Sequence, residues 1–207
     1  MTALSQILEN KIVAIIRGAD PDDVLKIAEA LYAGGVVLME VTLNSPNALE
    51  VIKQVSVAMR GKMLIGAGTV LDATAATSAI DAGAQFIISP CLDVEVIKTT
   101  KARGAVSIPG AYTPTEIVTA YNNGADIIKV FPASSNVNYI KEIRAPLPHI
   151  PLMPTGGVSL ENIGEFLKAG AVAFGIGTSL VNTKETVTDE YLMKLKERAG
   201  EFVRRIA

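Results

Sequence analysis

The chain has 207 residues with a formal net charge of -2, and 49% of its residues are hydrophobic. This composition supplies enough apolar surface for one hydrophobic core and excludes a disordered linker, while the balanced charge and the absence of Trp argue against nucleic-acid binding. One Cys and one His exclude an internal disulfide and a Cys/His zinc site, so we expect no metal.

The first residues, MTALSQILENK, lack a basic region and do not resemble a secretory signal peptide, and we expect a short N-terminal helix there. The longest apolar run, from Ala30 to Met39, has ten residues, fewer than the roughly 18 that span a bilayer. We therefore expect a cytoplasmic protein that does not enter a membrane.

Eight apolar, β-branched stretches follow in chain order, with a helical pattern between each pair. The predicted strands are residues 12–17, 37–42, 64–69, 86–90, 106–110, 127–132, 152–157 and 173–178. Each spacing holds one strand, one helix and two short loops. Eight such units predict the α/β class and a single parallel (β/α)8 TIM barrel, formed by one domain over residues 1–207.

Capping and turn residues predict where the helices begin and end. Three pairs place a capping side chain ahead of Pro at a predicted first helical position: Asp20-Pro21, Ser45-Pro46 and Thr113-Pro114. Five glycines are expected to end helices in a left-handed conformation: Gly34, Gly83, Gly104, Gly124 and Gly170. The last outer helix is predicted over residues 186–207.

Three charged residues interrupt strands that should be apolar. Glu40 lies in the second strand, Lys129 in the sixth, and Arg17 ends the first. All three lie in the second half of their strands, and barrel enzymes place catalytic groups at the carboxyl ends of strands. A lysine among apolar neighbours has a lowered pKa, and its neutral amine attacks carbonyls, so Lys129 is the candidate nucleophile.

The same residues permit two interpretations that the sequence leaves open. Lys129 and Glu40 could form a structural ion pair instead of a reacting pair. Glu40 could neutralise a cation or could carry protons during catalysis.

Loops of small residues follow three strands. Thr155-Gly156-Gly157 and the 175–179 loop, which contains Ser179, come after the last two strands, where many barrels bind phosphate through backbone N–H groups. The alternative is that these glycines only permit tight turns. The glycines of the 66–69 segment could admit a ligand close to the Thr69 hydroxyl, or could relieve crowding inside the barrel.

Two further residues are assigned away from the chemistry. His149 precedes the seventh strand and belongs to the opposite rim, which excludes a Ser-His or Cys-His pair. Cys91 follows the fourth strand on the active face without a base, and we expect it to form part of the pocket wall.

Five motifs together resemble the 2-keto-3-deoxy-6-phosphogluconate (KDPG) aldolases, also called 2-keto-4-hydroxyglutarate (KHG) aldolases. They span the chain in order: GVVLMEVTL from Gly35, GAGTV from Gly66, ISP from Ile88, IKVFPA from Ile128 and PTGGV from Pro154. The resemblance implies a class I, metal-free aldolase that needs no cofactor, acts on a small 2-keto acid and forms a homotrimer.

The resemblance also implies roles for individual residues. Lys129 matches the Schiff-base lysine and Glu40 the general acid/base, which agrees with the assignments made from the strands. The matching substrate-binding positions are Arg17 for a carboxylate, Thr69, Pro90 and Thr155 near the pyruvyl group, and Gly156, Gly157 and Ser179 at the phosphate end.

The sequence departs from the family pattern at three positions. Asn44 stands where many members have Arg, which shifts carboxylate binding to Arg17, and Val130 replaces a usual Leu or Phe. Val137 stands where a Gly often follows the lysine motif. The loop there could therefore have a different shape, and the preference for a phosphorylated substrate is left open.

The expected reaction is cleavage of KDPG to pyruvate and glyceraldehyde 3-phosphate, in the Entner-Doudoroff pathway, together with cleavage of 4-hydroxy-2-oxoglutarate to pyruvate and glyoxylate. The alternatives are an aldolase for the galactonate-derived epimer of KDPG and a barrel that binds a phosphate ligand without catalysis.

Overall fold

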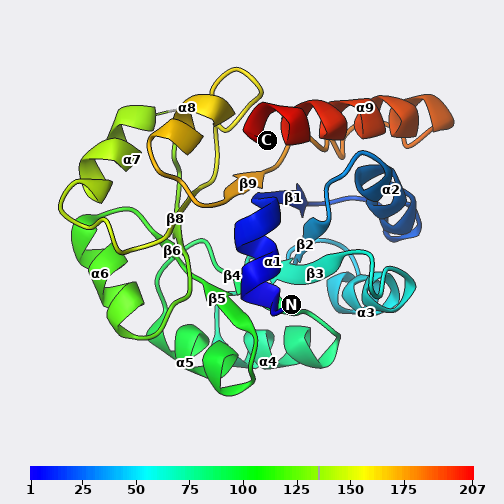
Figure 1. Cartoon of the computed structure of the whole chain (residues 1–207). Helices are drawn as coiled ribbons and strands as arrows, with labels where there is room; N and C mark the ends of the chain where they lie inside the picture. Colours follow the sequence, from blue (N-terminus) through cyan, green and yellow to red (C-terminus); the bar gives the residue numbers. More distant parts are fainter. Residues whose placement is uncertain (135) are drawn as a thin grey trace.

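The computed structural model describes residues 1–134 and 136–207, in which parallel strands alternate with helices (Figure 1). The strands are β1 (Ile12–Ile16), β2 (Leu38–Thr42), β3 (Leu64–Gly68), β4 (Phe86–Ile88), β5 (Val106–Ile108), β6 (Gly110–Ala111), β7 (Ile128–Val130), β8 (Leu152–Pro154) and β9 (Phe174–Ile176). The helices are α1 (Ala3–Asn10), α2 (Pro21–Ala33), α3 (Ala48–Ala58), α4 (Ala73–Asp81), α5 (Val94–Ala102), α6 (Pro114–Asn122), α7 (Val137–Arg144), α8 (Ile163–Lys168) and α9 (Asp189–Ile206). The predicted N-terminal helix is confirmed as α1.

The strands form two curled parallel sheets. One has the order β5-β4-β3-β2-β1-β9 and the other β6-β7-β8, and a parallel bridge between Thr155 and Gly175 connects β8 to β9. The fifth predicted strand is divided into β5 and β6 at Pro109, because proline has no N–H to donate to a neighbouring strand. The predicted alternation of strands and helices is confirmed, and closure of all the strands into one barrel stays a prediction.

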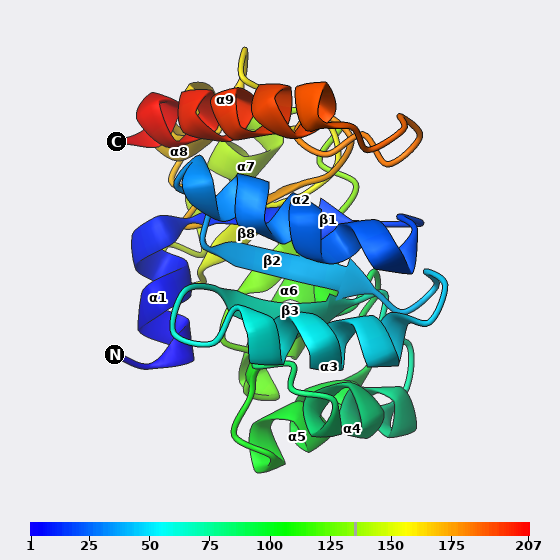
Figure 2. The same cartoon turned by 90° about the vertical axis from the view of Figure 1, so that its right-hand side faces the viewer.

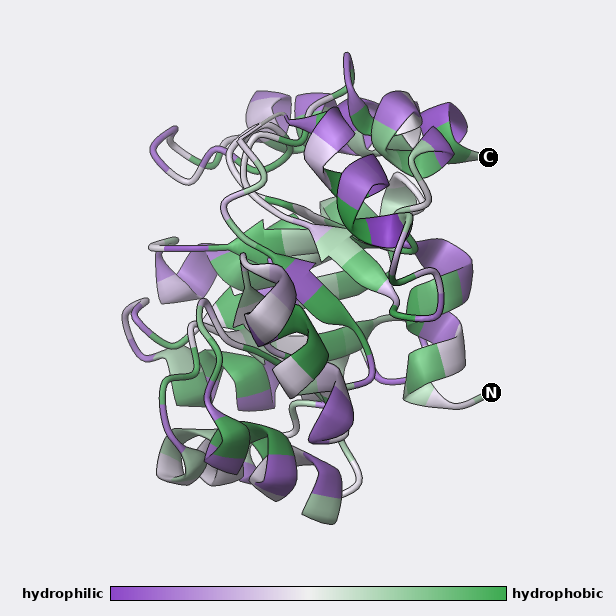
Figure 3. Cartoon of the chain, turned by 90° about the vertical axis from the view of Figure 1, so that its left-hand side faces the viewer, coloured by the Kyte–Doolittle hydropathy of each residue, from purple (hydrophilic) through white to green (hydrophobic). Residues whose placement is uncertain are grey.

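The core has two parts, one on each side of the strands. Helices α2 to α9 surround the strands, and their apolar faces pack against the outer side of the sheets (Figures 1 and 3). The inner side holds a separate apolar cluster that includes Val13, Leu38, Phe86 and Ile127, together with Ile7 of α1. Figure 2 shows α1 at the end where the strands begin, so this helix covers that end of the interior and leaves the carboxyl ends of the strands for a site.

The helix caps confirm two of the three predicted Pro starts. Asp20 caps α2, and Thr113 forms a capping box with Glu116 at α6. The prediction for Ser45 was wrong, because α3 begins at Ala48 and the Ser45 hydroxyl instead accepts the N–H of Gly18 at 2.9 Å. This contact joins the loop after β2 to the loop after β1.

The left-handed helix ends are confirmed at four of the five predicted glycines. The exception is the end of α2, where Gly35 has the positive φ of 91° and Gly34 does not. Gly34 lies where α2 meets α9, and a Cβ there would overlap the backbone of Lys196. The last helix begins at Asp189 instead of residue 186, because the Thr188 side chain caps it.

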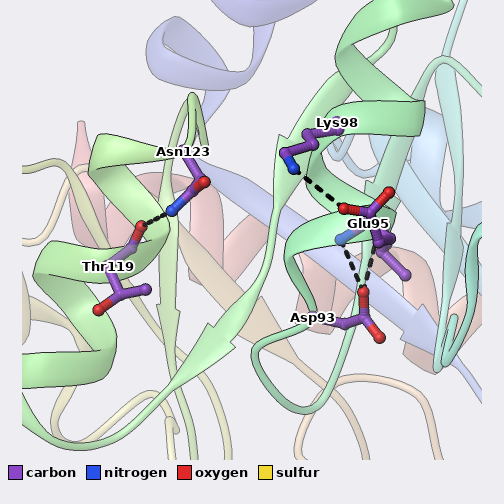
Figure 4. Close-up of polar contacts among 6 residues, drawn as sticks. Asp93, Glu95, Lys98, Thr119 and Asn123 are labelled. Carbon is purple, nitrogen blue, oxygen red and sulfur yellow. Dashed lines mark hydrogen bonds and ion pairs between the residues drawn. The ribbon is translucent and has the colours of Figure 1, made fainter.

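Local polar contacts stabilise the start of α5 and the end of α6. Figure 4 shows Asp93 accepting the N–H groups that start α5, an ion pair between Glu95 and Lys98 at 3.0 Å, and the Asn123 amide bound to the carbonyl of Thr119 at 2.8 Å. In the described parts of the chain, no helix is long and apolar enough to cross a membrane.

Candidate active site

Two ionisable side chains lie inside the molecule, and they come from strands of the two different sheets. Lys129 of β7 pairs with Gly110 and Met153 on its two sides, and its side chain is 3% exposed. Glu40 of β2 is 1% exposed. Leu38 and Ile127, each two residues earlier in the chain, belong to the inner cluster, so Glu40 and Lys129 point inward one layer nearer the carboxyl ends.

Small residues make the space that these side chains need. A Cβ at Gly68 would overlap the Glu40 carboxyl group, and a Cβ at Gly66 would overlap the ring of Phe86. The glycines of the 66–69 segment therefore relieve crowding inside the strands, and the role of Thr69 beside a ligand stays a prediction.

The electrostatics of the pair follow from burial. Desolvation raises the pKa of Glu40 above its ordinary value, and the positive charges of Lys129 and Arg17 oppose this shift only in part. Desolvation lowers the pKa of Lys129, with Arg17 adding to the shift and Glu40 opposing it. Both directions favour a neutral amine beside a neutral carboxyl group.

A structural ion pair between Lys129 and Glu40 is not observed. Neither oxygen of the Glu40 carboxyl group has a hydrogen-bond partner among the described residues. The Lys129 ammonium position instead lies 4.7 Å from the centre of the Phe131 ring. Buried titratable groups with shifted pKa values cluster at functional sites.

A cavity of about 680 Å³ opens at the carboxyl ends of the strands. It has the size of a small-molecule site. Its lining includes six of the predicted site residues: Arg17, Lys129, Thr155, Gly156, Gly157 and Ser179.

The other three predicted site residues do not line this cavity. Glu40 is buried outside its lining, and a negative charge on it would oppose the lowering of the Lys129 pKa. Thr69 is half-buried with a φ of 56°, and the backbone of Pro90 lies against Gly110, the strand neighbour of Lys129. The structure brings Pro90 close to the lysine strand through the backbone and gives Thr69 no contact with the lysine.

The glycine loops after β8 and β9 form one wall of the cavity. Gly156 and Gly157 both have positive φ angles, of 81° and 83°, which favour glycine. The Ser179 hydroxyl donates to the carbonyl of Val158 at 2.6 Å and joins the two loops. Such a wall of turns suits an anionic group.

The structure adds lining residues that the sequence analysis missed. Phe131 contacts the lysine, and Asn182, Thr183 and Lys184 come from the loop between β9 and α9. A signal for this loop existed, because it follows the last predicted strand at the active face. The sequence pattern indicated only the outer helix over residues 186–207.

His149 lies away from the cavity as predicted, whereas Cys91 does not form the predicted part of its wall. His149 is exposed in the turn before β8 and packs edge-on against Tyr121, away from the cavity. Cys91 is exposed and close enough to Lys129 to influence its pKa, but it does not line the cavity. Among the described residues, no group of three or more His, Cys, Asp or Glu side chains is placed to hold a metal ion.

The sequence profile of the family described as KDPG and KHG aldolase matches residues 4–196. The chain belongs to this aldolase family. It is 34% identical to the 2-dehydro-3-deoxy-6-phosphogalactonate aldolase of Escherichia coli K12 over 93% of each chain. It is 36% identical to a 2-dehydro-3-deoxy-phosphogluconate aldolase of Pseudomonas aeruginosa, over 77% of this chain and 73% of the relative.

A solved structure of an aldolase also matches the fold. The KDPG aldolase of Legionella pneumophila, 27% identical, superimposes with a TM-score of 0.86 over 96% of this chain and 97% of its own. That protein was captured with pyruvate as a covalent carbinolamine intermediate. Membership of the family makes this chain a carbon-carbon lyase of the aldolase type.

Proposed function

We propose that this aldolase works through a Schiff base on Lys129. The observation that carries the proposal is a buried lysine with a lowered pKa that lines a cavity and has a buried carboxyl group as its electrostatic neighbour. A neutral amine is the form that attacks a ketone. The carbinolamine of pyruvate in the Legionella pneumophila relative supports the same chemistry here.

The proposed cleavage follows from the placement of the groups. The amine of Lys129 adds to the C2 ketone of a 2-keto-4-hydroxy acid and loses water to form an iminium, which accepts electrons when the C3–C4 bond breaks. Glu40, directly or through a water molecule, first gives its proton to the hydroxyl group that leaves the carbinolamine as water. The resulting carboxylate takes the C4 hydroxyl proton and later returns a proton to C3 of the enamine. Hydrolysis of the resulting imine releases pyruvate and restores the amine.

Binding of the substrate uses both ends of the cavity. Arg17, which influences Lys129 and Glu40 electrostatically, holds the C1 carboxylate. Gly156, Gly157 and Ser179 hold a distal phosphate, while Thr155, Thr69 and Pro90 surround the pyruvyl group. No metal takes part in the proposed reaction, and the enzyme is a cytoplasmic homotrimer of one-domain barrels in which β1 to β9 close around the site.

The proposed substrate is KDPG, cleaved to pyruvate and glyceraldehyde 3-phosphate, with 4-hydroxy-2-oxoglutarate as a second substrate. The phosphogluconate aldolase of Pseudomonas aeruginosa supports the first assignment. The second candidate is the galactonate-derived epimer, which the 34% identity to the Escherichia coli enzyme over 93% of both chains favours. The two substrates differ only in configuration at C4, so an assay of cleavage with each epimer decides between them.

Borohydride reduction in the presence of pyruvate tests the covalent step. We expect a stable adduct on Lys129, located by peptide mass spectrometry, and full activity after dialysis against a chelator. Lys129→Met should remain folded, form no adduct and lose at least about 10⁴-fold in turnover, because the covalent route is gone. A wild-type protein without an adduct would exclude the Schiff base, and turnover by the variant would exclude the proposed nucleophile.

A further inference from the structure

The loop between β9 and α9 brings a lysine to the cavity that the aldolase chemistry does not use. Lys184 is exposed and lines the cavity together with Asn182 and Thr183. The loop projects at the side of the molecule where the strands end (Figure 2). Its position in the chain, after the last strand, places it beside the glycine loop that contains Ser179.

Hydrogen bonds hold this loop in a defined position. The Thr183 hydroxyl donates to the backbone carbonyl of Arg17 at 2.6 Å, which joins the loop to the end of β1. The Asn182 side-chain oxygen accepts the N–H of Lys184 at 3.3 Å. Lys184 is therefore presented on an ordered turn.

The loop also keeps its own carboxylate out of the cavity. The Asn182 amide donates to the Glu185 carboxylate at 2.6 Å, and Glu185 is not part of the cavity lining. No Asp or Glu lines the cavity in the described parts of the chain, whereas Arg17, Lys129 and Lys184 all do. The lining is therefore suited to an anionic ligand.

Lys184 lacks, among the described residues, the carboxylate partner that some exposed lysines of the chain have. Lys26 binds Asp23 at 2.9 Å, and Lys194 binds Glu190 at 2.6 Å. No ion pair joins Lys184 to any described carboxylate within 4.0 Å. Its ammonium group is available for a ligand.

We propose that Lys184 is a specificity-determining residue that binds the distal phosphate of the substrate. The C1 carboxylate is bonded to C2, the carbon that reacts with the buried Lys129, so it lies deep in the site. Arg17 and Lys184 are both exposed, but Lys184, unlike Arg17, is not among the charges that shift the pKa of Lys129 or Glu40. It therefore meets the far end of the substrate, where a dianionic phosphate gains more from an ammonium group than a neutral hydroxyl does.

The inference rests on the proposed function, and Lys184→Met tests it. We expect kcat/KM for a phosphorylated substrate to fall by about 3- to 10-fold relative to its dephosphorylated analogue, since one exposed charge contact is lost. Lys184→Arg should restore most of the preference. Lys62→Met, which removes an exposed lysine from the turn before β3 at the opposite end, is the matched control and should leave both values unchanged. An unchanged preference in Lys184→Met would overturn the inference.

Binding of glycerol 3-phosphate, measured by calorimetry without turnover, separates this inference from the proposed function. The dissociation constant should rise by about 3- to 10-fold in Lys184→Met and stay unchanged in Lys62→Met. If wild-type protein forms no pyruvate adduct but shows this rise, the proposed function fails and the phosphate contact stands. If the adduct forms and the variant binds as tightly as wild type, or wild type does not bind, the phosphate contact fails alone.

Discussion

Two successive layers of side chains on the inner side of the sheets are both buried, but one layer is apolar and the other contains ionisable groups. In the first layer, Leu38 and Ile127 are fully buried in an apolar cluster that Ile7 of α1 closes. In the second layer, two residues further along the chain, Glu40 and Lys129 are just as deeply buried. The first layer has the side chains of a stable core, and the second carries two ionisable groups whose desolvation opposes folding.

The same strands thus carry one layer of side chains that stabilises the fold and a second layer that serves catalysis. Apolar side chains in the first layer stabilise the fold through burial. Burial in the second layer shifts the pKa values of both groups toward their neutral forms, which opposes stability when they are charged and favours the amine that a nucleophile needs. Substitutions in the two layers should therefore have opposite effects on activity and on the free energy of unfolding.

Glu40→Gln should have the largest effect on catalysis among substitutions that leave the lysine intact. We expect turnover to fall by about 10²- to 10⁴-fold, because the amide cannot transfer the proton. The pyruvate adduct on Lys129 should still form. Turnover close to wild type in a steady-state assay would show that another group carries the proton.

The same substitution gives a test of the raised pKa through stability. Burial raises the pKa of Glu40 above 4.5, so the folded chain retains a proton that the unfolded chain loses in this range. The wild-type free energy of unfolding should therefore decrease, through this group, as pH rises from 4.5 through the folded pKa. Glu40→Gln does not titrate, so its stability relative to wild type should increase over that window in urea unfolding. A relative decrease would contradict the burial effect.

Gly68→Ala should have the next largest effect. The added methyl group would occupy the position of the Glu40 carboxyl group and displace it. We expect about a 10²-fold loss of turnover, since small misplacements of a catalytic group have effects of this size. Gly61→Ala, at an exposed turn where a Cβ meets no atom within 4 Å, is a control for folding but carries its own strain from a positive φ. Unchanged kcat in Gly68→Ala would mean that the position of Glu40 is not critical.

Leu38→Ala should have the smallest effect on kcat and a large effect on stability. The substitution removes a fully buried side chain from the first layer, and we expect it to lower the free energy of unfolding by about 2–5 kcal/mol. The activity of the folded fraction, measured well below the unfolding temperature, should stay near wild type. A selective loss of kcat without a loss of stability would show that the two layers are not separate in function.

The sequence predicted the elements more reliably than their contacts. The spacing of the strands, the inward direction of Glu40 and Lys129, and the caps at Asp20 and Thr113 depend on residues close together in the chain, and the structure confirms them. Ser45 was assigned wrongly because its partner, the N–H of Gly18, is 27 residues away. A local pattern does not contain that information.

The sequence by itself determined that parallel strands alternate with helices and that three charges lie near the carboxyl ends of strands, because both follow from local periodicity and the direction of the chain. Only the tertiary structure decided that Glu40 fills the space left by Gly68, that it makes no hydrogen bond to Lys129, and that Lys184 joins Arg17 at one cavity. These are distances between residues far apart in sequence, and packing sets them.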